Sequence, residues 1–115
     1  MQLMHEKIGK VVVVKPLETR IDGTVAAEFR NEMGAIIEEG AEALVLDLSA
    51  VDLMDSTGLG ALVASLKMLR GKGEMVISGA SGKVTSLFKI TKMDQIFRIF
   101  ANRDDAVAAL LASRR

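Results

Sequence analysis

Short apolar runs alternate with stretches of helical periodicity along most of this chain, and this alternation is the feature that most restricts its fold. Residues 11–14 are four valines, and residues 43–48 are apolar except for Asp47. Runs of this length that are rich in branched aliphatic residues predict strands that are buried on both faces. Residues 75–77 predict a third strand, and residues 96–100 predict an edge strand with a less regular pattern.

Helical periodicity fills the intervals between these runs. Apolar residues recur three and four positions apart in 25–37, 59–69 and 84–88, as expected for helices with one buried face. A last helix follows the polar residues 102–105, which include candidate N-caps. Its inward-facing side chains are expected to be Val107, Leu110 and Leu111.

Strands that alternate with helices of this length predict an α/β fold. We expect one domain over residues 1–115, with a mixed, mostly parallel sheet of four to five strands and four helices packed on it. The optional fifth strand is residues 2–7. The pattern does not predict the order of the strands in the sheet.

Composition excludes several classes of function. Fifteen basic residues balance fifteen acidic ones, and the only aromatic residues are four phenylalanines. The chain therefore lacks the basic surplus and the stacking side chains that nucleic-acid binding requires. It has no cysteine, so disulfides and thiolate metal sites are excluded. With no apolar run long enough to span a bilayer and no secretory signal at its start, we expect a cytoplasmic protein without membrane insertion.

Two fragments resemble ligand-binding motifs without completing them. Residues 78–85 follow a strand and precede a helix, as a phosphate-binding loop does, but Ile77 and Val84 stand where the Walker pattern needs glycine and a hydroxyl. Asp47 and Ser49 occupy a strand end where some metal sites begin, but the other oxygen ligands are missing. We interpret the first as a helix N-terminus and Asp47 as a carboxylate satisfied by loop N–H groups.

Two further fragments give no support for catalysis or for a cofactor. His5, the only histidine, is near the N-terminus without a partnered nucleophile, so we expect it to be solvated. The glycines of 71–73 follow a helix and lack the third glycine of a dinucleotide loop. The sequence therefore predicts no enzyme activity, no cofactor and no metal.

The segment 55–60, Asp-Ser-Thr-Gly-Leu-Gly, is the candidate functional site. Asp55 or Ser56 can serve as the N-cap of the following helix. Gly58 and Gly60 fall in the first turn of that helix, where each glycine costs about 1 kcal/mol relative to alanine. Two interpretations stay open. The glycines admit the backbone of another protein or a bend, or they relieve packing against a neighbouring strand.

Residues 51–60 resemble the signature of STAS domains, the domains of sulfate transporters and anti-sigma factor antagonists. The resemblance continues in Arg20-Ile21-Asp22, in the central strand 43–48, and in Leu-Phe-Lys-Ile at 87–90 followed by Ile96-Phe97. It covers essentially the whole chain and implies a STAS-like fold.

The chain departs from the family pattern at two places. Thr19 stands where the antagonists usually have glycine, and Lys92-Met93 stands where Gly-Leu is common. These departures leave the expected fold unchanged but affect the expected partner surface.

The resemblance implies an anti-sigma factor antagonist. Such a protein would bind an anti-sigma factor that is also a serine kinase, and would release a sigma factor while unphosphorylated. By resemblance Ser56 is the phosphate acceptor, with Thr57 the less favoured candidate, and a PP2C-type phosphatase removes the phosphate. The expected partner contacts are Asp22, Asp55, Ser56, Thr57, Gly58, Leu59 and Gly60.

Two alternatives of other classes remain at this point. The chain could be a STAS subunit of a membrane transport assembly, such as a lipid transporter, without a phosphorylation switch. It could also be a nucleotide-binding domain, although the incomplete phosphate loop at 78–85 disfavours this function.

Overall fold

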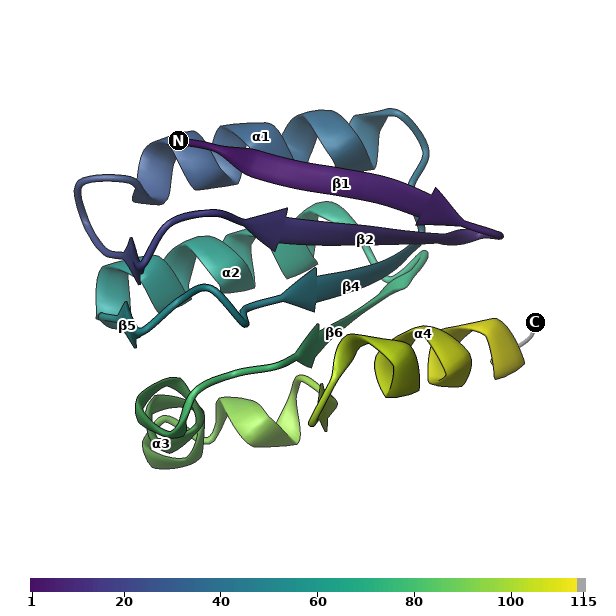
Figure 1. The fold of residues 1–115 in the computed structure, drawn as a ribbon. Helices are drawn as coiled ribbons and strands as arrows, with labels where there is room; N and C mark the ends of the chain where they lie inside the picture. Colours follow the sequence, from purple (N-terminus) through teal and green to yellow (C-terminus); the bar gives the residue numbers. More distant parts are fainter. Residues whose placement is uncertain (114–115) are drawn as a thin grey trace.

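The computed structural model describes residues 1–113 and shows a mixed sheet at the centre of the molecule (Figure 1). The order of its five strands is β1-β2-β4-β6-β7. Strand β1 is antiparallel to β2, and the remaining pairs are parallel. The predicted fold class is confirmed, and the optional strand expected at residues 2–7 is present as the first strand. The strands are β1 (Leu3–Ile8), β2 (Val11–Pro16), β4 (Ala43–Asp47), β6 (Glu74–Ser78) and β7 (Ile99–Phe100).

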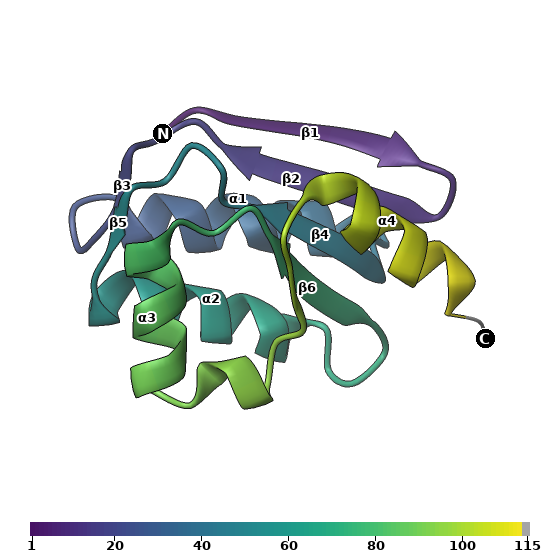
Figure 2. The ribbon, with the colours of Figure 1, turned by 60° about the horizontal axis from the view of Figure 1, so that its bottom comes forward.

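Four α-helices and one short 3₁₀ helix cover this sheet. Helices α1 and α2 pack against each other on one face, and α4 lies across β2, β4, β6 and β7 on the opposite face (Figure 2). Within residues 1–113, none of the helices is long and apolar enough to cross a membrane. The helices are α1 (Ala26–Glu38), α2 (Ser56–Met68), α3 (Gly82–Ile90), η1 (Met93–Gln95) and α4 (Arg103–Ala112).

The core is divided by the sheet, because successive side chains of a strand point to opposite faces. In β2, Val14 belongs to the larger cluster with residues of α1, α2 and α3, whereas Val11 and Val13 belong to a smaller cluster under α4. Burial on both faces explains why the valine run is continuous rather than alternating with polar residues.

Two details differ from the sequence predictions. Leu111 was expected to face inward but is 46% exposed, because Val107 and Leu110 already fill the inward side of α4. The predicted strand 96–100 is a strand only at Ile99–Phe100, although it does lie at the sheet edge. Residues 96–98 form the connection between η1 and this strand.

A second, two-stranded sheet lies beyond the carboxyl end of the main one. It pairs β3 (Arg20–Ile21) with β5 (Leu53–Met54) in parallel. The sequence did not predict these strands, since two residues are too few to show a period. This small sheet places the segment after β3 beside the segment after β5, where α2 begins.

Candidate functional site

The pairing of β3 with β5 brings the predicted site residues together. Ile21 is opposite Met54 in this parallel pair, so Asp22 and Asp55 follow their strands at the same edge. A β-carbon at Gly23 would lie 3.9 Å from Cγ2 of Thr57, which shows that the loop after β3 adjoins the first turn of α2.

Asp55 is the N-cap of α2. Its backbone is extended, with φ −103° and ψ −177°, and its Oδ1 accepts a hydrogen bond from the Gly58 N–H at 2.9 Å. Its carbonyl accepts from the Leu59 N–H at 2.9 Å. One predicted contact residue therefore has a structural role as well, because its carboxylate satisfies an N–H that would otherwise have no partner at the helix start.

Ser56 is the first residue of α2, and both Ser56 and Thr57 are exposed. Both residues lie at the N-terminus of α2, which is the positive end of the helix dipole. A negative group is stabilised at this position. Each hydroxyl is accessible to a phosphate donor, and the geometry alone does not distinguish between the two acceptors.

The two glycines of the motif have different explanations. A β-carbon at Gly58 would overlap the carbonyl oxygen of Ile21 and lie 2.9 Å from the carbonyl carbon, so this glycine is required by packing of α2 against β3. A β-carbon at Gly60 would have no neighbour within 4 Å, and the residue is exposed. The packing interpretation holds for Gly58, whereas Gly60 leaves open surface beside the site.

Leu59, which was predicted as a contact residue, is instead a core residue. Its side chain is only 6% exposed and belongs to the larger core cluster. Leu59 lies one helical turn after the N-cap, on the side of α2 that faces the core. It therefore packs beneath the exposed residues of the first turn of α2.

Asp22 is held in a fixed orientation by Thr24. Its Oδ1 accepts hydrogen bonds from the Thr24 N–H at 2.9 Å and from the Thr24 hydroxyl at 2.6 Å, and Arg20 Nε is 3.7 Å from Oδ2. These Thr24 hydrogen bonds, with a smaller contribution from Arg20, lower the pKa of Asp22 below its ordinary value of 3.8. The sequence prediction missed Thr24, although Asp-Gly-Thr is a typical turn of this kind.

The surface around Ser56 is acidic. Asp52 and Asp55 are exposed, and the side chain of Asp22 is 23% exposed. Arg20, at the start of β3, is already paired with Asp22. A phosphate on Ser56 would add further negative charge to a surface that already carries three carboxylates.

The incomplete motifs have structural roles. Ser81 is the N-cap of α3 and its Oγ accepts from the Val84 N–H at 3.3 Å, so segment 78–85 does form a helix start as interpreted. Oδ1 of Asp47 accepts from the Ser49 N–H at 3.0 Å. Over residues 1–113 there is no group of three or more His, Cys, Asp or Glu side chains that could hold a metal ion.

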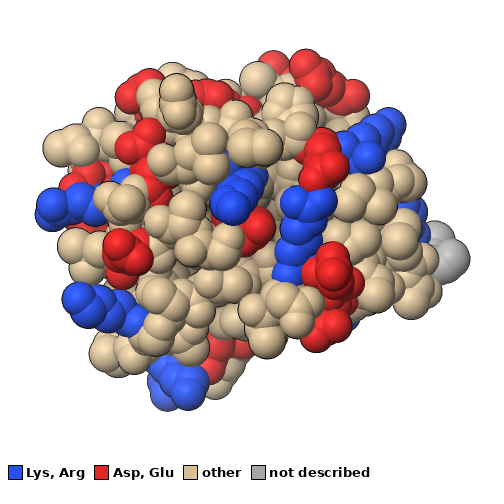
Figure 3. Space-filling view, in the orientation of Figure 1, with Lys and Arg blue, Asp and Glu red and all other residues tan. Residues whose placement is uncertain are grey.

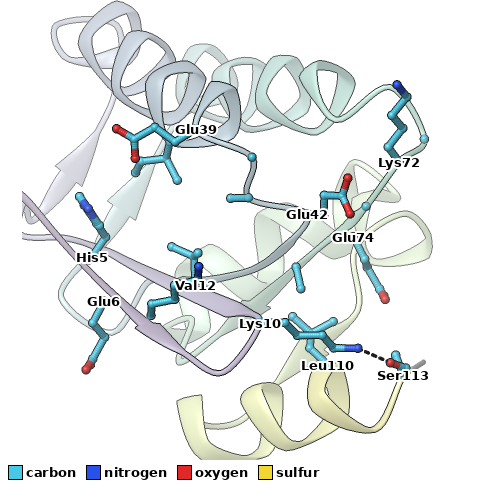
Figure 4. A pocket seen from close by; sticks show the side chains of 17 residues that line it. His5, Glu6, Lys10, Val12, Glu39, Glu42, Lys72, Glu74, Leu110 and Ser113 are labelled. Atoms are coloured by element: carbon cyan, nitrogen blue, oxygen red, sulfur yellow. Dashed lines mark hydrogen bonds between the residues drawn. The ribbon is translucent and has the colours of Figure 1, made fainter. Parts of the chain in front are cut away.

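An open cavity of about 890 Å³ lies at the other end of the sheet (Figure 4). Its lining includes His5 of β1, Glu39 and Glu42 between α1 and β4, and Lys72 between α2 and β6. All four are remote from the first turn of α2. None of the predicted contact residues lines this cavity.

Comparison with known proteins assigns the family. The sequence profile of the STAS domain matches residues 2–106. The chain therefore belongs to the STAS domain family.

Several bacterial relatives align over most of the chain. The anti-sigma-F factor antagonist RsfB of Mycobacterium tuberculosis is 32% identical over 106 residues, covering 90% of this chain and 84% of the relative. The anti-sigma-B factor antagonist of Listeria monocytogenes is 42% identical over 80 residues, covering 69% and 70%. That of Bacillus subtilis is 34% identical over 88 residues, covering 76% and 80%.

Solved structures show the same fold. An anti-sigma factor antagonist from Mycobacterium paratuberculosis superimposes with a TM-score of 0.87 at 27% identity, covering 96% of this chain and 93% of the other. Unphosphorylated SpoIIAA, an anti-sigma factor antagonist, superimposes with a TM-score of 0.70 at 17% identity, covering 97% and 100%.

Proposed function

We propose that this STAS domain, residues 1–115, is a cytoplasmic anti-sigma factor antagonist whose binding is controlled by phosphorylation of Ser56. It acts as a binding module rather than as an enzyme. Its partners are an anti-sigma factor with serine kinase activity and a PP2C-type phosphatase. The observation that carries this proposal is the exposed Ser56 hydroxyl at the first position of α2, and the names of the relatives support it.

The phosphate should be tolerated by the fold. A phosphoserine carries about −1.5 to −2 charges at neutral pH. At the N-terminus of α2 the helix dipole favours such a charge by roughly 0.3–1 kcal/mol. Because Ser56 is exposed, the phosphate stays in water and displaces no core residue. We therefore expect the backbone to remain nearly unchanged.

The same charge should strongly oppose binding of a partner that places a carboxylate against Ser56. A like charge about 4 Å away, at an effective dielectric near 20, costs on the order of 4 kcal/mol. This corresponds to nearly three decades in affinity. The intermolecular effect therefore exceeds the effect on the fold, and the switch works through surface charge.

Incubation with the kinase and ATP, followed by phosphopeptide mapping, tests the acceptor. We expect phosphate on Ser56, its loss in Ser56→Ala, and its retention in Thr57→Ala. Binding of Ser56→Asp to the kinase should be weakened at least a hundredfold while its melting temperature stays close to that of wild type. A Ser56→Asp variant that unfolds, or that binds as tightly as wild type, would contradict the proposal.

A further inference from the structure

Three segments of the chain, 7–17, 67–72 and 82–92, each carry three basic residues and no acidic one, and only 82–92 includes α3. Residues 82–92 contain Lys83, Lys89 and Lys92 and no acidic residue, so the remaining residues carry twelve basic and fifteen acidic side chains. All three lysines are exposed. None of them forms an ion pair with the part of the chain that the structure describes. Basic side chains project from the surface over α3 in Figure 3.

Large aliphatic side chains lie among these lysines. Ile90, at the end of α3, is 80% exposed, and Ile96, just after η1, is 54% exposed. The side chains of α3 that are buried in the core are those of Val84 and Phe88. The two isoleucines therefore belong to neither core cluster. A protein contact surface usually has an apolar centre and a polar rim, and here the lysines would form that rim.

Lys92 has an unfavourable backbone conformation. It lies just after the C-cap of α3 with φ 64° and ψ 17°, the left-handed region that favours glycine at this position. A lysine here is a strained choice for the fold alone. Arg70, directly after the C-cap of α2, has the same conformation with φ 53°. Lys92 differs from Arg70 in that it follows the exposed Ile90 of α3.

This surface adjoins the acidic surface around Ser56. Helix α3 contacts β5, and Asp55 directly follows β5 at the start of α2. Figures 1 and 2 both show α3 beside the β5 end of the molecule. A partner that covers Ser56 is therefore placed to reach the lysines of α3 as well.

We propose that the exposed side of α3 and the residues around η1, formed by Lys83, Lys89, Ile90, Lys92 and Ile96 and including the exposed Asp94 of η1, is a second docking surface for the protein that binds at Ser56. This inference rests on the proposed function. The partner presents carboxylates to the lysines and an apolar depression to Ile90. The complementary charges orient the partner during encounter and raise its association rate.

A protein partner fits this surface better than an anionic membrane. Three lysines are fewer than the four to eight basic residues that typically recruit anionic lipids. The carboxylates of Asp22, Asp52 and Asp55 lie at the same end of the molecule and would be repelled by a negatively charged bilayer.

Charge reversal tests the surface against a matched control. The triple variant Lys83→Glu/Lys89→Glu/Lys92→Glu and the control Lys7→Glu/Lys67→Glu/Lys72→Glu change net charge equally, and all six lysines are exposed. Association of each with the purified anti-sigma factor kinase is measured at low and high salt. We expect the first variant to associate at least tenfold more slowly and to lose most of its salt dependence, while the control changes by less than threefold.

Two single substitutions separate binding from folding. Lys92→Gly should raise the melting temperature by a few degrees, because it removes the strain at φ 64°, and yet weaken kinase binding. Ile90→Ser should weaken binding about tenfold with an unchanged melting temperature, whereas Leu111→Ser, also exposed, should leave binding unchanged.

The outcomes distinguish this inference from the proposed function. If Ser56→Asp weakens kinase binding but the α3 variants bind like wild type, the second docking surface is wrong and the switch stands. If wild type does not bind the kinase, both are overturned. Sedimentation of wild type, but not of the triple variant, with phosphatidylglycerol vesicles, together with unchanged kinase binding, would reassign the surface to a membrane and overturn the proposal.

Discussion

The α-carbon of Gly58 lies directly against the carbonyl group of Ile21, with no room between them for a methyl group. This contact joins the first turn of α2 to β3. It therefore fixes the position of Ser56 relative to the loop that carries Asp22. The motif glycine thus belongs to the architecture of the site.

Gly58→Ala should therefore destabilise the fold. The β-carbon can be accommodated only by moving backbone, and overpacking of this kind costs about 1–3 kcal/mol or more. Gly60→Ala is the matched control, since its β-carbon meets no atom within 4 Å, and it should stabilise α2 by up to about 1 kcal/mol. Urea denaturation of both variants measures the difference. Equal effects of the two substitutions would show that the Ile21 contact is unimportant.

Asp55→Ala should lower stability by about 0.5–2 kcal/mol through loss of the N-cap. Asp55→Asn keeps an oxygen that can accept from the Gly58 N–H and should recover most of that loss, while it removes the negative charge. Chemical denaturation reports the cap, and kinase affinity reports the charge. Identical stabilities for the alanine and asparagine variants would argue against a capping role.

Thr24→Val should raise the pKa of Asp22 towards 3.8, because it removes the hydroxyl that donates to Oδ1 at 2.6 Å. The folded-state pKa of Asp22 is lower than the unfolded value, so ionised Asp22 stabilises the fold above the unfolded pKa, and this stability is lost as the pH falls through the folded pKa. The stability difference between wild type and Thr24→Val should accordingly shrink in acid. Carboxyl-carbon NMR titration measures the pKa directly, with Thr91→Val as the control for loss of a remote hydroxyl.

Phe88 and Phe97 form an edge-to-face pair, with ring centroids 5.9 Å apart and an angle of 68° between the ring planes. The pair attaches the segment after η1 to α3, and both rings are fully or almost fully buried. Replacing either ring by leucine should cost about 1–3 kcal/mol. A double-mutant cycle should give a coupling energy of roughly 0.5–1.5 kcal/mol, and additive single effects would show that the rings contribute independently.

Most of the main sheet could be predicted from periodicity, because its central strands are buried on both faces and read as continuous apolar runs. The predicted N-cap role of Asp55 or Ser56 followed from residue type, and the structure assigns it to Asp55. The two-residue strands β3 and β5 could not be predicted, since their pairing is a tertiary contact without a local pattern.

Less of the candidate site than of the sheet could be predicted from the sequence. Asp22 entered only through the resemblance to STAS domains, because 33 positions separate it from Asp55 and local spacing cannot relate the two. Leu59 was expected both at the start of the apolar face 59–69 and among the partner contacts, and its burial fits the first of these expectations. A helix has inward and outward positions within a single turn, so not every residue of a helical motif can face a partner.

The position of helix α4 on its own face of the sheet has a consequence for the synthesis of the chain. Among the described residues, helix α4 is the last element in chain order, and it is the one helix that packs against Val11, Val13, Val45 and Val76. Because α4 spans Arg103–Ala112, those valines can be covered only after this last segment has been synthesised. Until then the aliphatic side chains that form this side of the core have no covering helix, and exposed apolar surface of this kind favours aggregation during folding.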